Sequence, residues 1–127
     1  MNKYPWLEQY LLDKPGARRD YKLEWAWDRW LVGDKMFAAI CTPDPKYTAH
    51  AGRNMVILKC DPQRALLYRG EFEDIVPGFY SDKRTWNTVY LDGSVPEEVL
   101  REMCDASYDL VTAKLTKALR RELGLLP

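Results

Sequence analysis

Polar and apolar side chains alternate along residues 86–91 with the period of two expected of a β-strand. Trp86, Thr88 and Tyr90 fall on one side, and Asn87, Val89 and Leu91 on the other. Asp92-Gly93 then predicts a sharp turn, because glycine tolerates a positive φ. Ser94 followed by Glu97 is a capping-box pattern, which predicts that a helix begins there. We therefore expect a strand, a turn and a helix over residues 83–111.

Further strands are predicted at residues 21–28, 35–42 and 55–60. The first alternates cleanly, which is typical of a half-buried strand. Gly33-Asp34 predicts a hairpin turn before the second strand. Within that strand, Met36–Ile40 is almost continuously apolar, as in a central strand covered on both faces. Residues 43–52 have no periodicity and are predicted to be a loop.

Helical spacing predicts three helices. The first covers residues 4–14 and ends at Pro15-Gly16. The second begins at Asp61-Pro62, which provides an N-cap and a first-turn proline, and stops at Gly70. The third runs over residues 95–123, with a kink or break expected near residues 105–107.

This order of elements predicts an α+β fold, in which an antiparallel sheet and helices gathered on one face form a two-layer sandwich. The chain has 127 residues, which suits one domain spanning 1–127. Hydrophobic residues make up 46% and charged residues 30%, a balance that excludes a disordered chain. The three cysteines are widely spaced and each lies in an apolar run, so we expect buried free thiols and a cytoplasmic protein. No apolar run approaches membrane-spanning length, so no membrane partner is expected.

Residues 83–111 also resemble the MmcQ/YjbR family. The matching motifs are Trp86, Thr88-Val89, Leu91-Asp92-Gly93, Pro96-Glu97-Glu98, Asp105, Ser107-Tyr108 and Leu110-Val111. The early segment Lys14-Pro15-Gly16-Ala17 resembles the N-terminal marker of the same family. The resemblance implies a CyaY-like (frataxin-like) fold, also described as a double-wing DNA-binding fold, and it implies DNA as a partner.

Charge sets this chain apart from typical DNA-binding proteins. It has 19 basic and 19 acidic side chains and a formal net charge of +0, whereas proteins that bind nucleic acid strongly are usually basic. Binding would therefore depend on a local patch, and would be weak and sensitive to salt. The expected contacts are with backbone phosphates, because no basic recognition helix is evident. The candidate DNA-binding residues are Arg18, Arg19, Lys22, Arg53, Lys59, Lys83, Arg84, Trp86 and Asn87.

Other candidates are weaker by sequence. The cations of the C-terminal run, Lys114, Lys117, Arg120 and Arg121, are best interpreted as a solvated outer face. Trp25 and Trp27 are expected in the core, while Trp30 and Trp86 are better candidates for surface stacking.

Two alternatives to DNA binding remain distinguishable. A protein-interaction or regulatory module could use the same sheet face, because aromatic residues favour interfaces. A frataxin-like metal-handling protein would need converging carboxylates, and we expect no metal site, because His50, the one histidine, lies in a polar loop and is expected to be exposed. Enzyme signatures such as a nucleophile elbow or a phosphate-binding glycine loop are missing, so we expect neither catalysis nor a cofactor.

Overall fold

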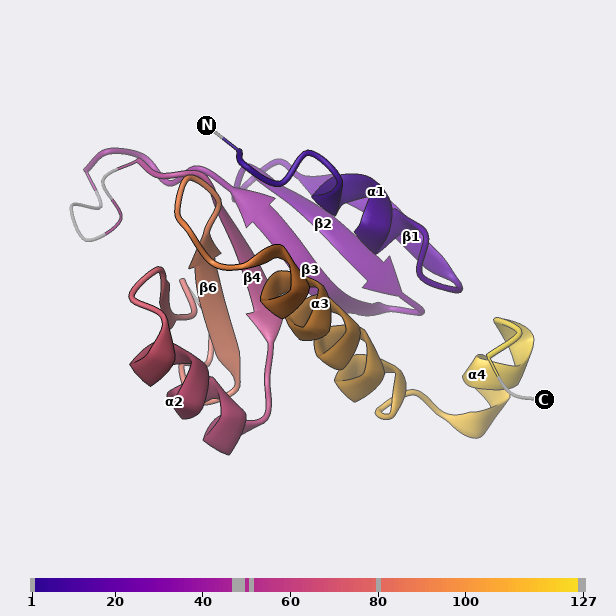
Figure 1. Cartoon of the computed structure of the whole chain (residues 1–127). Helices are drawn as coiled ribbons and strands as arrows, with labels where there is room; N and C mark the ends of the chain where they lie inside the picture. Colours follow the sequence, from indigo (N-terminus) through magenta and orange to yellow (C-terminus); the bar gives the residue numbers. More distant parts are fainter. Residues whose placement is uncertain (1, 47–49, 51, 80, 126–127) are drawn as a thin grey trace.

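The structure is a computed structural model that describes residues 2–46, 50, 52–79 and 81–125. Six strands form one sheet in the order β1-β2-β3-β4-β6-β5, and every neighbouring pair is antiparallel (Figure 1). The strands are β1 (Ala17–Lys22), β2 (Trp27–Val32), β3 (Lys35–Cys41), β4 (Met55–Lys59), β5 (Ile75–Pro77) and β6 (Trp86–Tyr90). The predicted α+β fold with an antiparallel sheet is confirmed.

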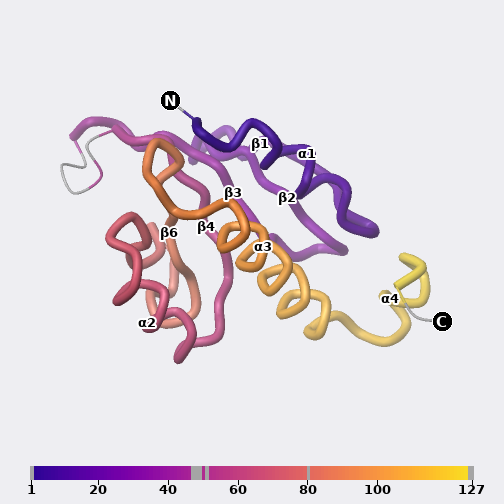
Figure 2. Tube along the Cα trace, viewed as in Figure 1, coloured from indigo at the N-terminus to yellow at the C-terminus, as the bar shows by residue number. Residues whose placement is uncertain are grey.

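Helices lie on one side of this sheet. They are α1 (Leu7–Leu12), α2 (Pro62–Glu71), α3 (Glu97–Thr112) and α4 (Lys117–Glu122). The longest, α3, packs on β3 and β4, while α1 packs beside β1 and α2 beside β5 and β6 (Figure 2). Among the described residues no helix is both long and apolar enough to cross a membrane.

The alternation of side chains along the strands divides the buried residues into two clusters. The larger cluster lies between the sheet and the helices and includes Trp30, Phe37, Leu58 and Leu100. The smaller lies on the opposite side, which we call the open face because no helix packs on it (Figure 1). Its buried members are Trp27, Ala39, Cys41, Met55, Ile57, Phe79 and Tyr90. Strand β3 contributes to both clusters, which confirms that it is a central strand covered on both sides.

The strand predicted at residues 21–28 is wrong, because the chain reverses direction inside it. Strand β1 ends at Lys22 and β2 begins at Trp27, and the turn between them is closed by backbone bonds from Trp25 N–H to Lys22 C=O and from Ala26 N–H to Leu23 C=O. Ala26 takes a φ of 56°, which side chains other than glycine rarely adopt. The turn therefore carries none of the glycine, proline or asparagine signals that reveal a hairpin in a sequence.

The last helix also differs from its prediction. Instead of one helix with a break near residues 105–107, α3 continues through that segment and the chain breaks after Thr112. A second helix begins at Thr116, whose hydroxyl accepts a bond from Leu119 N–H. Ser94 does not cap α3 either: Pro96 is the N-cap residue, and Ser94 N–H donates to Asp74 Oδ2 at 3.0 Å.

Helix α2 begins as expected, because the Asp61 carboxylate accepts bonds from the N–H groups of Gln63 and Arg64. It continues one residue beyond the predicted stop at Gly70. Strand β5 has no strong sequence pattern and was missed. It ends at Pro77, and at the next residue, Gly78, an added Cβ would lie 2.7 Å from Trp86 Cβ, so only glycine lets this segment approach β6 so closely.

Candidate nucleic-acid interface

Strand pairing places one row of side chains across the open face. Arg18 is opposite Leu31, Leu31 is opposite Met36, and Lys59, one strand further along, is opposite Trp86. The turn that precedes β6 adds Lys83 and Arg84, both exposed, beyond the Trp86 end of the row. We call Arg18, Lys59, Lys83, Arg84 and Trp86 the cationic row. These five candidates, far apart in sequence, therefore lie on one side of the sheet.

Within the described part of the chain, Arg84 is the one cation of this row that forms a salt bridge, with Asp82 at 3.5 Å. Lys59 Nζ lies 5.8 Å from the centre of the half-buried Trp86 ring, a cation–π arrangement. Lys83 Nζ donates to Gly78 C=O at 3.1 Å. Lys59 and Arg18 lie within electrostatic range of Asp82 and Asp20, respectively, but neither forms a salt bridge within the described residues.

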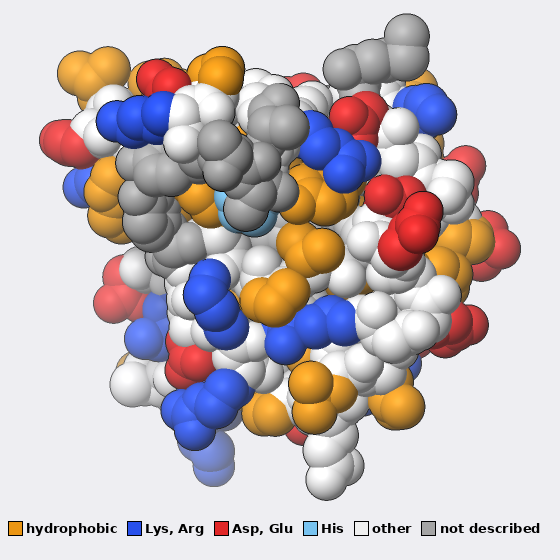
Figure 3. Space-filling model, turned by 90° about the vertical axis from the view of Figure 1, so that its left-hand side faces the viewer, with side chains coloured by type: hydrophobic (Ala, Val, Ile, Leu, Met, Phe, Trp, Pro, Cys, Tyr) orange, Lys and Arg blue, Asp and Glu red, His pale blue; other side chains and the backbone are white. Residues whose placement is uncertain are grey.

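Figure 3 shows the β5–β6 side of the molecule, where several Lys and Arg side chains surround a band of hydrophobic ones. Asp and Glu side chains lie along both margins of this view, with the larger group on the right. Although the whole chain has a net charge of +0, its charges are thus unevenly distributed over the surface.

Four of the nine sequence candidates lie outside the cationic row, and two of them lie on the helix side of the sheet. Arg19 points to the helix side, where it forms salt bridges with Glu8 at 3.0 Å and Asp28 at 3.2 Å. Asn87 is fully buried, accepts a bond from Arg69 Nε at 2.6 Å and donates to Ala65 C=O. Both were selected from sequence because of their side-chain type, and their places on the helix side exclude them from the open face.

Arg53 is also engaged elsewhere. Its guanidinium donates to Asp92 Oδ1 at 2.5 Å and to Asp74 Oδ1 at 3.4 Å, and it lies 3.6 Å from the centre of the Tyr90 ring. The bond from Arg53 lowers the pKa of the Asp92 carboxyl. Arg53 thus joins the starts of β4 and β5 to the turn after β6, and its charge is already neutralised.

Lys22 lies at the opposite end of the open face from the cationic row. Its Nζ is 3.6 Å from Glu24 Oε2 and stands over the Trp25 ring, 5.3 Å from its centre. The charge of Lys22 is therefore locally balanced, unlike that of Lys59 or Lys83.

The tryptophans lie differently from the sequence prediction. Trp30 is fully buried against the helices and cannot stack on a base, whereas Trp25 is 54% exposed at the tip of the β1–β2 turn. Trp27 is buried, as expected, but on the open face. The error on Trp25 and Trp30 follows from the missed turn, because a reversal of the chain between them changes which side chains reach the core.

His50 is half-buried, not exposed. Its Nδ1 lies 3.1 Å from the Tyr90 hydroxyl, and its ring packs edge-on against Phe79. Burial and the nearby charge of Lys83 lower the pKa of His50. The described residues contain no group of three or more His, Cys, Asp or Glu side chains that could hold a metal ion. The three cysteines are unpaired and buried, as predicted.

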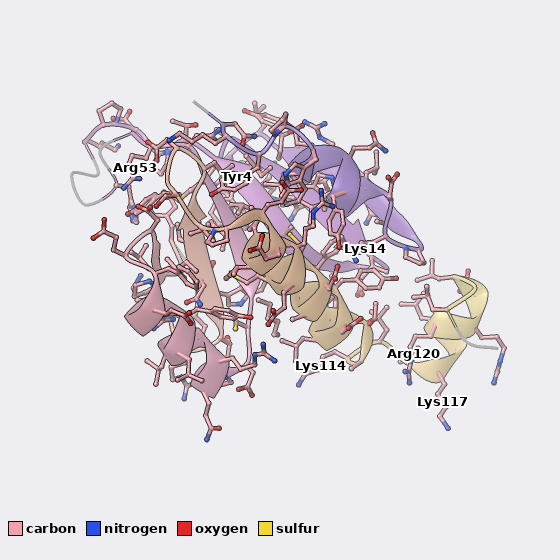
Figure 4. The ribbon with its side chains drawn as sticks, in the orientation of Figure 1. Tyr4, Lys14, Arg53, Lys114, Lys117 and Arg120 are labelled. Atoms are coloured by element: carbon pink, nitrogen blue, oxygen red, sulfur yellow. The ribbon has the colours of Figure 1, made fainter. Side chains whose placement is uncertain are left out.

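The basic residues of the C-terminal run do not form one stripe, because Lys114 lies in the turn after α3 and the others lie on α4. Figure 4 shows Lys114 at the end of α3, and Lys117 and Arg120 on α4, far from Arg53 at the other end of the molecule. Lys114 and Lys117 are exposed, in keeping with a solvated outer face.

The motifs that carry the family resemblance are joined to one another on the helix side. Lys14 forms a salt bridge with Asp105, the Tyr10 hydroxyl also donates to Asp105, and the Tyr108 hydroxyl donates to Pro15 C=O. These bonds connect the end of α1 to the middle of α3. The early marker around Lys14-Pro15 and the late marker around Asp105 are therefore two halves of one structural contact.

Ser107, another motif residue, connects α3 to the sheet. A bulge in β3 at Phe37 interrupts its pairing with β2. The Ser107 hydroxyl donates to Phe37 C=O at 2.5 Å and accepts from Lys59 N–H at 2.9 Å. It thereby bridges β3 and β4 just beyond Ala38 and Leu58, the last pair of their ladder. A buried serine in this motif thus has a structural role that its spacing alone did not reveal.

Comparison with known proteins identifies the family of this chain. The family model YjbR matches residues 12–110. The chain belongs to the YjbR family. A relative in Escherichia coli strain K12, named Uncharacterized protein YjbR, is 33% identical over 117 residues, which cover 92% of this chain and 93% of the relative.

Solved structures of two other bacterial proteins share the fold. Deinococcus radiodurans protein DR2400 is 35% identical, with a TM-score of 0.77 over 94% of this chain and 86% of that one. A Pseudomonas syringae protein at 20% identity has a TM-score of 0.72 over 87% of this chain and 98% of its own, which supports the fold alone. None of these names states an activity, so the YjbR assignment establishes ancestry and architecture.

Proposed function

We propose that this chain binds DNA without acting on it as an enzyme, and that the cationic row makes the contacts. The observation that supports this proposal is the common placement of Arg18, Lys59, Lys83 and Arg84 on one end of the open face, where Arg84 alone among them forms a salt bridge within the described residues. Unpaired cations on a surface without helices can approach a phosphate backbone without first breaking an ion pair.

The dimensions of the row suit a duplex. Arg18 and Lys59 are three strands apart in a sheet whose strands are about 4.8 Å apart, so they are about 14 Å apart at the backbone. This is comparable with the major-groove width of about 12 Å, which lets the two side chains reach phosphates on both sides of a groove. The exposed part of Trp86 between Lys59 and Lys83 adds an aromatic surface that does not depend on sequence.

A salt titration of the binding of this protein to duplex DNA tests the proposal. Four phosphate contacts predict that the logarithm of the association constant falls with the logarithm of salt concentration with a slope of about −3 to −4. No detectable binding at low salt, or a slope near zero, would contradict it.

A pair of charge-reversal variants locates the site. Lys83→Glu with Arg84→Glu should weaken binding to all duplex sequences alike and reduce the slope by about 2. Lys114→Glu with Lys117→Glu is the matched control, because it changes the net charge equally at exposed positions on the other end of the chain. If both variants reduce affinity equally, binding reflects net charge alone and the cationic row is not the site.

A protein-interaction role is the second candidate, and a specific observation favours it. Leu66 and Leu67 on α2 are among the most exposed large apolar residues. They adjoin a hollow of about 310 Å³ between α2 and α3, lined in part by Tyr68, Phe72 and Val99. A negative DNA titration, together with self-association in sedimentation experiments that Leu66→Ser and Leu67→Ser remove, would favour this role over DNA binding. A metal-handling role has no carboxylate cluster in the described residues to support it.

A further inference from the structure

A pocket of about 550 Å³ lies at the end of the open face away from the cationic row, where the β1–β2 turn and the end of β3 come together (Figure 1). This volume is in the range of sites that hold small molecules. None of the residues that line it belongs to the cationic row or to the contacts between the family motifs.

The interior of the pocket is apolar and aromatic. Trp27, Cys41 and Phe79 contribute buried side chains, and Trp25 forms a wall with its ring edge-on to Trp27 at 5.2 Å between centroids. Burial raises the pKa of the Cys41 thiol to about 12, so this group is neutral at physiological pH. The inner part of the pocket therefore provides aromatic surfaces and no charge.

Charge is confined to the rim, where the carboxylates of Glu24 and Asp44 lie with the ammonium group of Lys46, and the ammonium group of Lys22 is 3.6 Å from Glu24 Oε2. An aromatic wall beside carboxylates is an arrangement that attracts organic cations, because the face of an indole ring is electron-rich. The carboxylates would repel an anionic ligand and could offer a neutral one hydrogen bonds only.

The protein itself already places an ammonium group in this arrangement. Lys22 Nζ lies 5.3 Å from the centre of the Trp25 ring and 3.6 Å from Glu24 Oε2. An ammonium at this position interacts with an aromatic face and a carboxylate together. The Trp25–Glu24 pair is thus arranged to accept a cation, and a ligand cation bound there would take the place of Lys22 Nζ.

The backbone at the pocket is strained. Ala26 takes a φ of 56° between the two tryptophans and itself lines the pocket. A left-handed conformation costs about 1–2 kcal/mol for a residue other than glycine, and such strain tends to persist where the surrounding structure serves a function. Here the strained turn holds a largely exposed tryptophan over the opening of a pocket, although burial in the core would stabilise the fold more.

We propose that this pocket binds a small organic cation, an alkylammonium or quaternary ammonium compound, with its charged group against Trp25 and the rim carboxylates and its apolar part toward Trp27 and Phe79. The site is separate from the DNA-binding surface proposed above, and it does not require that surface to be functional.

The test uses choline as the cationic probe and, as a neutral match, the alcohol in which carbon replaces the ammonium nitrogen. We expect choline to shift the indole N–H resonances of Trp25 and Trp27 in NMR titrations, and to bind at least about fivefold more tightly than the neutral alcohol. Equal affinity of the two probes would contradict the cationic class, and unchanged resonances with both would contradict the site.

Variants then assign the interaction to residues. Trp25→Ala should weaken choline binding by about tenfold, whereas Tyr21→Ala should not change it; Tyr21 is a matched control because it is an exposed aromatic residue on the adjacent strand at 55% exposure. Glu24→Gln with Asp44→Asn should weaken choline binding and leave the neutral alcohol unaffected. If the Lys83→Glu, Arg84→Glu variant retains choline binding, the pocket acts independently of the cationic row; loss of choline binding in that variant would contradict a separate site.

Discussion

The two sides of the sheet use their polar residues in opposite ways. On the helix side, Lys14, Asp105, Ser107 and Tyr108 are bonded to one another or to backbone groups across the fold. On the open face, Lys59 and Lys83 lie near no salt-bridge partner within the described chain, and Trp25 is largely exposed. The residues that identify the YjbR family therefore mainly build its fold, and the residues available for binding lie on the other side.

Membership of the YjbR family therefore predicts the helix-side contacts of a relative, but not its binding surfaces. A relative that keeps Asp105, Ser107 and Tyr108 would be expected to keep the joint between α1, α3 and the sheet. It would not thereby keep the cationic row or the aromatic pocket, since none of the helix-side contacts depends on them. Family membership is consequently stronger evidence for architecture than for a ligand.

Two tryptophans that lie five positions apart give the largest expected contrast in stability. Trp30→Ala should lower the free energy of unfolding by about 3–5 kcal/mol, because it leaves a large cavity between the sheet and the helices. Trp25→Ala should lower it by less than about 1 kcal/mol, because much of that ring already contacts solvent. Urea unfolding monitored by circular dichroism measures both; similar losses would show that the open face also depends on Trp25 for its stability.

Ser107→Ala should have the next largest effect, a loss of about 1–3 kcal/mol. The substitution removes the hydroxyl that bridges Phe37 C=O and Lys59 N–H, and both groups are then left without this partner in a buried position. Ser81→Ala is a matched control beside the open face, because its hydroxyl bonds, within the described residues, only to Phe79 C=O, two residues away, and the change should alter stability by less than about 0.5 kcal/mol.

Hydrogen exchange gives an independent measure of the same bridge. Exchange at the Lys59 amide should accelerate in Ser107→Ala more than in Ser81→Ala, after correction for global stability. Equal protection in the two variants would mean that the backbone closes the gap between β3 and β4 without the hydroxyl.

The sequence alone predicted the parts of the fold that follow simple periodicity. Apolar spacing and the expected turn or capping residues mark four of them: the central strand, the turn at Gly33-Asp34, the Asp61 cap and strand β6. The β1–β2 turn was missed because Ala26 adopts a left-handed conformation that its side chain does not favour. The end of α3 was missed because the apolar spacing continues into α4, so that the break falls among residues with good helical propensity.

The candidate site was only partly predictable, for a related reason. Strand pairing brings Arg18, Lys59 and Trp86 to one side of the sheet, and the sequence positions alone did not predict this grouping. Arg53 and Asn87 look equally suitable in sequence, and only their tertiary partners Asp92 and Arg69 exclude them. The aromatic pocket depends on a turn that the sequence does not mark, so no pattern could have brought Trp25 and Cys41 together.

Acidic pH should destabilise the fold. Bonds from Arg53 and from Arg29 lower the pKa of Asp92 and of Asp20 in the folded protein. A carboxyl whose folded pKa lies below its unfolded value of about 3.9 stabilises the fold above that value, and loses this contribution as pH falls through the folded pKa. Unfolding free energies measured between pH 6 and pH 2 should therefore fall below about pH 4.

Single variants divide this acid sensitivity between two regions of the sheet. Asp92→Asn, directly after β6, and Asp20→Asn, on β1 at the other edge of the sheet, should each flatten the decline, whereas Asp34→Asn should leave it unchanged, because Asp34 is exposed and forms no salt bridge in the described part of the chain. If Asp20→Asn has no effect, the open-face pair of Asp20 and Arg29 does not stabilise the fold.

The smallest expected effect is a gain in stability at the pocket. Ala26→Gly should raise the free energy of unfolding by a few tenths to about 1 kcal/mol, because glycine relieves the left-handed strain but loses more conformational freedom on folding. The control is Gly33→Ala in the other hairpin turn, which should destabilise the fold, because φ is 63° there and the new Cβ would lie 3.0 Å from Leu119 Cδ2. A higher free energy of unfolding in Ala26→Gly would show that the turn beside the pocket is not optimised for stability, whereas the turn at Gly33, which packs against Leu119 of α4, is. A lower free energy of unfolding would instead mean that packing of the Ala26 side chain outweighs the strain of its backbone. The open face would then depend on side-chain packing for its stability, as the helix side does.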